Sequence, residues 1–457
     1  MCGIFGIYPH KEAAKITYLG LYALQHRGEE AAGIIARNGR GSYLHKAQGL
    51  VSDVFDKKSL GLLRGELAVG HVRYSTTGSS NIKNTQPFYV RAKNGDIAIA
   101  HNGNLTNALN LRRELEQKGA IFQSTMDSEV IAHLLTHCQK KDCQEIVTWS
   151  LSQLEGAYSL AIMFNDILVG ARDPFGFRPL CLGKLGQSYI LASETCALDL
   201  VDAQYMRDIE PGEVVFIRKD KIDSIKPFEK KRCAFCIFEY IYFARPDSSI
   251  FENNVYAVRK RLGEELAKEY PVKADVVTPI PDSGTYAALG FSKASGIPFE
   301  MGLIRNHYIG RTFIQPVQYL RDFRVKIKLN PVKNILKGKS VAVIEDSIVR
   351  GTTSRARIKT LREAGAKEIH MRVSCPPLRH PCFFGIDFPT HKELIAVKHD
   401  LKWIRDFIGV DTLEYLSLEG MLNAMPIEKE NFCTACFDGN YPLKPARKLS
   451  KRMLERV

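Results

Sequence analysis

The 457-residue sequence has no apolar run approaching the roughly 20 residues that a helix needs to cross a bilayer, and it has no low-complexity tract. Its first residues, Met-Cys-Gly-Ile-Phe-Gly-Ile, lack the basic region of a secretory signal. We therefore expect neither a membrane span nor a secreted product, and we expect a cytoplasmic chain. The residues that are present, 45% hydrophobic and 25% charged, are typical of a globular protein long enough for two or three domains.

Lysine and arginine outnumber aspartate and glutamate by 64 to 50, which gives a net charge of +14. Three sources of this charge stay open: a nucleic-acid partner, an anionic small-molecule substrate, or a basic surface without a specific ligand. The basic residues are spread along the chain, and the basic tail at residues 444–456 lacks the interleaved aromatic residues of a base-stacking surface. We expect no nucleic acid among the partners.

The hydrophobic pattern divides the chain in two. Up to about residue 217 it predicts short strands broken by turn residues, with helices at 13–24 and 127–137, which is typical of an α+β layer. After the charged segment 218–232, our candidate linker, two units of strand, glycine-containing loop and helix follow: 274–280, 281–284 and 285–294, then 340–344, 345–353 and 354–364. This alternation indicates a mostly parallel sheet covered by helices. We predict one domain over residues 1–230 and a second over residues 231–457.

Cys2 is a candidate nucleophile. If Met1 is removed, Cys2 carries both a thiol and a free α-amine, whose pKa of about 7.7 to 8.0 lets it accept the thiol proton near neutral pH. Taken alone, this start of the chain is weak evidence for catalysis, because buried cysteine is a common small hydrophobe.

Four segments give Cys2 a context: residues 24–28 (Leu-Gln-His-Arg-Gly), 70–76, 100–105 and 125–129. In this order they resemble the N-terminal-nucleophile glutaminase domain, of αββα architecture, that several glutamine amidotransferases share. The resemblance implies that Arg73 and Asp127 bind the carboxylate and the ammonium of glutamine. It also implies that the Asn102 side chain and the Gly103 backbone N–H stabilise an oxyanion.

Each of these residues has a simpler interpretation by itself. Arg73 and Asp127 could form an ordinary surface pair, and Asn102-Gly103 is the strongest short hairpin signal. One departure from the family pattern is Glu29, since the family commonly has glutamine after His-Arg-Gly.

Residues 341–353, Val-Ala-Val-Ile-Glu-Asp-Ser-Ile-Val-Arg-Gly-Thr-Thr, resemble the motif with which type I phosphoribosyltransferases bind phosphoribosyl pyrophosphate (PRPP). Acids at the end of a strand can bind ribose hydroxyls and approach Mg²⁺, while a helix N-terminus receives the 5′-phosphate. The predicted Mg²⁺ ligands are Ser283, Glu345 and Asp346, with Glu345 at a position that is often aspartate. The predicted PRPP-binding residues are Ser283, Gly284, Asp346, Ser347, Gly351, Thr352, Thr353 and Lys326.

Two further segments support this assignment. Residues 281–284, Pro-Asp-Ser-Gly, end the earlier strand and resemble the family's pyrophosphate loop, although alone they would be a plain turn. Residues 305–328, which include Lys326, resemble a flexible basic loop that covers PRPP; a solvated basic face is the alternative.

The sequence has eleven cysteines, and a reducing cytoplasm argues against a disulfide framework. Cys433 and Cys436 form a C-x-x-C pair, Cys382 follows Pro381, and Cys236 opens the segment 236–248. The family resemblance assigns Cys236, Cys382, Cys433 and Cys436 to a [4Fe–4S] cluster. Four thiolates suit structural zinc equally well, so the residues alone leave the metal open.

Over nearly its whole length, ending before the basic tail, the chain resembles the amidophosphoribosyltransferase family. This implies glutamine-dependent conversion of PRPP to 5-phosphoribosylamine, glutamate and pyrophosphate, the first step of de novo purine biosynthesis. It also implies feedback by purine nucleotides and a homotetramer. The alternatives are another glutamine amidotransferase that shares the first domain, and a nucleic-acid-binding regulator built on a phosphoribosyltransferase fold.

Overall fold

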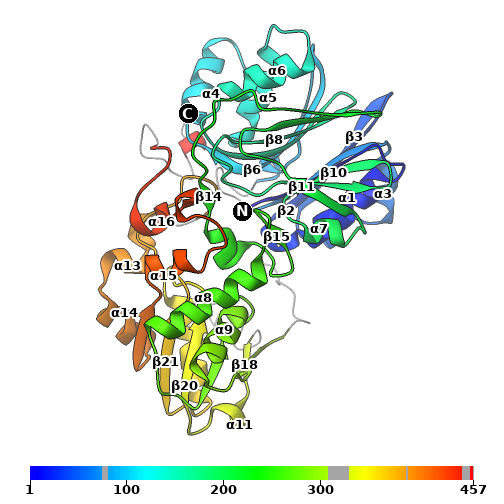
Figure 1. Ribbon diagram of the computed structural model, residues 1–457. Helices are drawn as coiled ribbons and strands as arrows, with labels where there is room; N and C mark the ends of the chain where they lie inside the picture. The colour runs from blue at the N-terminus through cyan, green and yellow to red at the C-terminus, as the bar shows by residue number, and fades with distance from the viewer. Residues whose placement is uncertain (75–80, 307–328, 388–389, 445–452, 456–457) are drawn as a thin grey trace.

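A computed structural model describes residues 1–74, 81–306, 329–387, 390–444 and 453–455 (Figure 1). Two lobes lie one above the other, and the N-terminus lies where they meet. Within the described residues, no helix is both long and apolar enough to cross a membrane.

The first lobe contains two antiparallel sheets. One has the order β11 (Gln204–Asp208), β9 (Cys181–Leu185), β10 (Ser188–Ala192), β1 (Gly3–Tyr8), β4 (Leu67–Arg73), β2 (Ala31–Asn38), β3 (Gly41–Gln48). The other has the order β13 (Ile222–Ile225), β12 (Val214–Ile217), β8 (Ile167–Arg172), β7 (Gly156–Phe164), β6 (Gly95–Leu105), β5 (Phe88–Ala92).

The two sheets bury a common apolar layer between them, which includes Ile4, Val69 and Ala100. A second cluster packs the first sheet against helices α1 (Ala13–Ala23), α2 (Val51–Val54), α3 (Lys57–Leu62) and α7 (Cys196–Asp199). A third packs the other sheet against α4 (Ala108–Gln117), α5 (Ser128–His137) and α6 (Cys143–Ser152). This is the predicted αββα arrangement.

The second lobe is built on a four-stranded parallel sheet, β17 (Val276–Pro279), β20 (Ser340–Glu345), β21 (Glu368–Val373), β22 (Thr412–Tyr415). Its helices are α8 (Val255–Glu269), α9 (Thr285–Ser295), α12 (Thr352–Glu363), α13 (Ile395–Lys398), α14 (Leu401–Ile408) and α15 (Leu418–Asn423). A smaller element adds β18 (Leu303–Arg305), β19 (Leu329–Pro331) and α11 (Lys333–Leu336). The predicted mixture of an α+β layer and a parallel α/β sheet is thus confirmed.

Short elements join the lobes. The π-helix η3 (Glu239–Phe243) follows β14 (Phe235–Cys236), which pairs in parallel with β23 (Phe432–Cys433) near the other end of the chain. The single-turn helix α16 (Ala435–Asp438) comes next, and the turn η6 (Met453–Glu455) returns to the first lobe, where Leu454 is buried against its core.

Local boundaries differ from the sequence-based expectations in two places. The charged segment 218–232 is not only a linker, because residues 222–225 form β13 and pair with β12 at the sheet edge. Helix α12 begins at Thr352, two residues before its predicted start, because Gly351 takes the left-handed conformation (φ +74°) that turns the chain into the helix.

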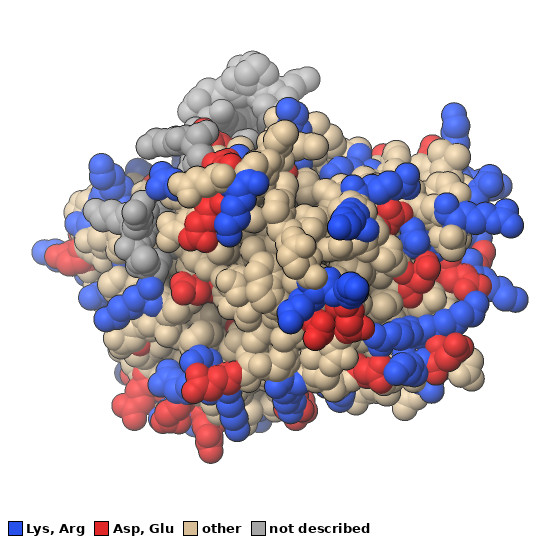
Figure 2. Space-filling model, turned by 90° about the horizontal axis from the view of Figure 1, so that it is seen from above, with Lys and Arg blue, Asp and Glu red and all other residues tan. Residues whose placement is uncertain are grey.

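On the face drawn in Figure 2, lysine and arginine side chains alternate with aspartate and glutamate. No continuous cationic strip is visible on this face. The positive net charge is distributed there as a mixed surface, which is not the pattern of a nucleic-acid-binding groove.

Candidate active sites

Cys2 directly precedes β1, the central strand of the first sheet. In the β1–β4 pairing Gly3 lies opposite Val72, so Arg73 and Tyr74 at the end of β4 come beside Cys2. The Cys2 thiol lies 3.5 Å from the Tyr74 carbonyl oxygen and is buried. Burial raises the pKa of this thiol, and the nearby Arg73 guanidinium opposes the rise. The thiol therefore needs a base before it can act as a nucleophile.

The α-amine at the start of the chain is the candidate base. Met1 is 1% exposed, and burial lowers the pKa of its α-amine to about 5, so that an amine in these surroundings is unprotonated at neutral pH. The Met1 side chain packs in the core of the second lobe, with its sulfur 2.8 Å from Arg178 Nη1. Removal of Met1, which would transfer the amine to Cys2, stays a prediction.

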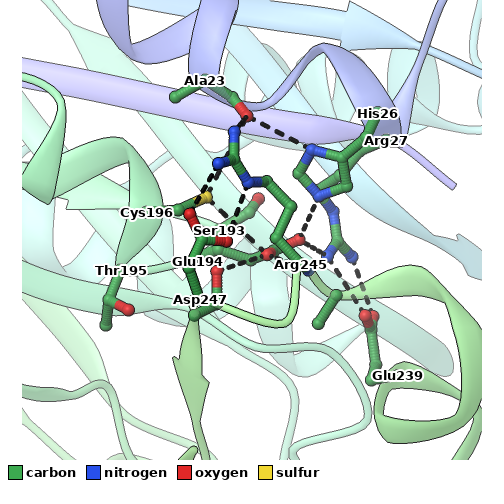
Figure 3. A network of polar contacts seen from close by, with 12 residues as sticks. Ala23, His26, Arg27, Ser193, Glu194, Thr195, Cys196, Glu239, Arg245 and Asp247 are labelled. Atoms are coloured by element: carbon green, nitrogen blue, oxygen red, sulfur yellow. Dashed lines mark hydrogen bonds and ion pairs between the residues drawn. The ribbon is translucent and has the colours of Figure 1, made fainter. Parts of the chain in front are cut away.

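A buried ion network holds the backbone of the nucleophile (Figure 3). Arg27 Nε donates to the Cys2 carbonyl oxygen at 2.9 Å, and Arg27 Nη2 donates to Glu239 Oε1 at 2.8 Å. Arg27 also pairs with Glu194, which accepts from the Ser248 hydroxyl and lies 2.8 Å from His26 Nε2. Arg27 and Glu194 belong to the first lobe, whereas Glu239 and Ser248 come from the second.

Sequence reasoning assigned no role to Glu194 or Glu239. Glu239 and Arg27 each fell within a motif segment, but their pairing joins residues 212 positions apart. The only sequence signal for this ion pair was that both an acid and a base lay within motif segments.

Asn102 and Gly103 lie inside β6, opposite Ser159 and Tyr158 of β7, so the hairpin interpretation of Asn-Gly is wrong. The Asn102 side chain is fully buried, and neither its oxygen nor its nitrogen has a hydrogen-bond partner in the described part of the chain. A buried amide without a partner is costly unless a ligand satisfies it. At Gly103 a side chain would overlap the Ala157 carbonyl oxygen, so only glycine fits.

Arg73 and Asp127, the predicted partners of glutamine, are both buried in this region. Burial lowers the pKa of Arg73, while Cys2, Glu30 and Asp127 oppose that change, which places all three acidic groups within electrostatic range of the guanidinium. Asp127 precedes α5, and its Oδ2 accepts from the Leu105 backbone N–H at 2.9 Å. Arg73 and Asp127 are thus a buried cation and a buried anion, and their burial excludes a surface pair.

Apart from Lys326, the predicted PRPP residues lie after the carboxyl ends of β17 and β20 and at the start of α12. Ile280 N–H donates to the Ile344 carbonyl at 2.8 Å, and Ser283 Oγ lies 2.5 Å from Asp346 Oδ1. Gly284 lies close to both strand ends, because a Cβ there would be 2.5 Å from the Ile344 oxygen. The exposed Thr352 and Thr353 begin α12, where free backbone N–H groups favour an anion.

The adjacent acids have different surroundings. Asp346 accepts from both Ser283 and Ser347. Glu345 is 2% exposed and accepts from Arg357 of α12, with both oxygens at 3.1 Å. Burial raises the pKa of Glu345 to about 8, although Arg357 opposes the rise. Asp346 with Ser283 offers oxygen ligands suited to Mg²⁺, whereas the Glu345 carboxylate is engaged by arginine.

The predicted covering loop lies mostly outside the described residues. Lys326 falls there, as do residues 307–325 and 327–328. Arg305, at the start of that segment, is described and pairs with Asp282 of the pyrophosphate loop.

The four cysteines assigned to a cluster come together between the lobes. The β14–β23 register sets Cys236 opposite Cys433, and Cys436 follows in α16. Burial raises the pKa of Cys433 and Cys436, and Cys236 and Cys382 add to both rises. The donor set, four cysteine sulfurs, is that of an iron–sulfur cluster or of structural zinc. Their sulfurs are not in the arrangement of a closed site, since no three His, Cys, Asp or Glu residues of the described chain are positioned to hold a metal ion.

Comparisons with known proteins cover both lobes. Residues 71–200 match the model of a glutamine amidotransferase domain. The chain is 51% identical to the amidophosphoribosyltransferase of Methanocaldococcus jannaschii over 97% of this chain and 98% of that protein, and 49% identical to that of Bacillus subtilis over 96% and 94%. A solved structure of the B. subtilis glutamine PRPP amidotransferase, complexed with ADP and GMP, superposes with a TM-score of 0.93 at 48% identity, covering 98% of this chain and 99% of that one.

Proposed function

The chain belongs to the amidophosphoribosyltransferase family, and we propose how its residues divide that family's reaction between the two lobes. The enzyme uses glutamine to convert PRPP into 5-phosphoribosylamine, glutamate and pyrophosphate, the first reaction of purine biosynthesis. Relatives that match along nearly the whole chain favour this function over another amidotransferase that shares only the first lobe.

In the first lobe, Cys2 is the nucleophile and a neighbouring α-amine is its base. Arg73 and Asp127 bind the carboxylate and ammonium of glutamine. Attack of the thiolate on the side-chain amide forms a tetrahedral oxyanion, which the Asn102 amide and the Gly103 N–H stabilise; its collapse leaves a thioester and releases ammonia. Water then hydrolyses the thioester to glutamate. The buried, unpartnered amide of Asn102 is the observation that best supports this assignment.

In the second lobe, ammonia displaces pyrophosphate from C1 of the ribose. Ser347, Gly351, Thr352 and Thr353 hold the 5′-phosphate at the start of α12. Ser283 and Gly284 hold the pyrophosphate, Asp346 binds the ribose hydroxyls, and Lys326 neutralises the leaving group. Ammonia is mostly protonated in neutral water, so a water-poor internal passage between the lobes is expected.

Two metal groups belong to the proposal. Asp346 and Ser283 would hold Mg²⁺, and Glu345 would lie near the ion while paired with Arg357. Bound Mg²⁺ would neutralise pyrophosphate charge. Cys236, Cys382, Cys433 and Cys436 would hold a [4Fe–4S] cluster, which would join the C-terminal segment to the second lobe. The surroundings of these residues support the proposal through their donor chemistry.

We also propose a cytoplasmic homotetramer regulated by purine nucleotides. The B. subtilis relative was solved with ADP and GMP, which supports nucleotide regulation of this chain. No nucleic-acid partner is proposed.

The decisive experiment compares Cys2→Ala with wild type after anaerobic purification of the full chain. The variant should lose PRPP-dependent glutaminase activity and keep synthesis from ammonia, because the second site is separate. Cys138→Ala, at another buried cysteine of the first lobe, should retain both activities. Glutaminase activity in Cys2→Ala, or full activity in protein that mass spectrometry shows to carry Met1, would refute the assignment.

A further inference from the structure

One segment of the second lobe, residues 382–385, lies directly against the predicted oxyanion-binding strand of the first. The Phe383 carbonyl oxygen accepts from Asn104 Nδ2 at 2.9 Å. The next carbonyl, that of Phe384, accepts from Arg178 Nε at 2.9 Å and from Arg178 Nη2 at 2.6 Å. Asn104 and Arg178 both belong to the first lobe, so two successive peptides of the segment are held across the junction.

These contacts are shielded from water. Arg178 is fully buried, and Phe384 is 2% exposed and stacks on Phe177 of the first lobe with ring centroids 4.2 Å apart. Hydrogen bonds from a buried guanidinium to a carbonyl are stronger than neutral ones. The segment is therefore a rigid neighbour of the first lobe and not a solvated connection.

Gly385 brings this segment onto Gly103 itself. A Cβ added to Gly385 would lie 2.9 Å from both the carbonyl carbon and oxygen of Gly103 and 3.0 Å from its Cα. Gly385 also has φ +103°, which residues with a side chain rarely adopt. The Gly103 backbone is thus confined by Ala157 of β7 and by Gly385 of the second lobe.

We propose that residues 382–385 are a positioning element for the oxyanion hole: Gly385 confines the Cα and carbonyl group of Gly103, the hydrogen bond to Asn104 holds the next residue, and together they fix the direction of the Gly103 N–H. This rests on the proposed function, in which the Gly103 N–H stabilises the oxyanion. The first lobe then carries the catalytic groups, but the second lobe completes their alignment. Cys382 begins the same segment and its sulfur accepts from the Phe384 N–H at 3.3 Å, so the cysteine site and the oxyanion hole share one short stretch of chain.

Gly385→Ala tests the proposal in the anaerobically purified full chain. The added methyl group must displace the Gly103 backbone, and a displacement near 1 Å costs about a hundredfold in rate. We expect glutaminase kcat to fall by about tenfold to a hundredfold with little change in the KM for glutamine, since Arg73 and Asp127 are untouched. Ammonia-dependent synthesis should be unchanged.

The matched control is Gly338→Ala. Gly338 also lies in the second lobe with positive φ (+74°), but a Cβ there meets no atom within 4 Å. It should reproduce any cost of backbone strain without the loss of kcat.

A second readout separates positioning from general damage. An aldehyde analogue of glutamine forms a tetrahedral adduct with a thiol and uses the oxyanion hole, whereas glutamine in its ground state does not. Gly385→Ala should weaken binding of the aldehyde far more than it raises the KM for glutamine. Equal changes in both, or a kcat like that of Gly338→Ala, would overturn the proposal.

If Gly385→Ala does not fold, Asn104→Ala tests the positioning role instead, because it removes the hydrogen bond to the Phe383 carbonyl without adding volume. It should lower glutaminase kcat in the same manner, and wild-type kinetics would overturn the proposal. Failure of the proposed function is distinct, since it would show as retained glutaminase activity in Cys2→Ala.

Discussion

Glu239→Gln should weaken the ion pair through which the second lobe orients Arg27 toward the backbone of Cys2. Arg27 and Arg178 bring two positive charges into the junction between the lobes, and Glu194 and Glu239 bring two negative ones; all four side chains are fully buried. Glutamine at position 239 leaves a net buried positive charge and weakens the pair that orients Arg27 toward the Cys2 carbonyl.

The expected loss of stability follows from this burial. Removing one partner of a buried ion pair costs about 3–5 kcal/mol, and the lower end applies because glutamine keeps an oxygen acceptor and Arg27 keeps Glu194. At about 2–4 °C per kcal/mol for a domain of this size, the thermal transition should fall by about 6–12 °C. Glutaminase kcat should fall by about tenfold or more, because Cys2 is less well oriented.

Thermal unfolding followed by circular dichroism and a glutaminase assay well below the transition provide the two measurements. Glu12→Gln is the matched control: it breaks an exposed pair with Lys15 and should have no measurable effect. If Glu239→Gln unfolded at the same temperature as Glu12→Gln and kept wild-type glutaminase kinetics, the role of the network would be refuted.

Two further predictions concern pH and the cysteine site. Burial lowers the pKa of His71 to about 3, so the folded chain stays neutral there while the unfolded chain binds a proton below about pH 6.5. The free energy of unfolding should therefore fall by about 1.4 kcal/mol per pH unit as the pH drops through this window. His71→Gln keeps a donor for the His101 carbonyl, and it should lose less thermal stability than wild type between about pH 7.5 and 5.5. An identical loss in both proteins would contradict the role of His71 in this pH dependence. Cys433→Ser should lower the iron and acid-labile sulfide bound by anaerobically purified protein, whereas Cys143→Ser should not; wild type that contains zinc without sulfide would refute the iron–sulfur proposal.

Many helices, strands and loops could be predicted because short stretches of sequence carry their signals. The glycine-containing loops at residues 281–284 and 345–351 follow apolar strands and precede helices, and this pattern identifies parallel strand ends from a single stretch of sequence. The start of α12 was missed by two residues, because a glycine with positive φ leads directly into the helix. Asn102-Gly103 shows the limit of local patterns: the pair favours a turn, but pairing with β7 keeps it extended within β6.

By itself, the sequence determined the two fold classes, the nucleophile candidate and the candidate phosphate-binding loops, since each is marked by short motifs. Only the tertiary structure decided which charges neutralise each other between the lobes, which carboxylate meets Arg357, and which segment confines Gly103. Those partners lie far apart in sequence or depend on how the two lobes pack. Complementary packing of that kind leaves no periodicity or motif from which it could be predicted.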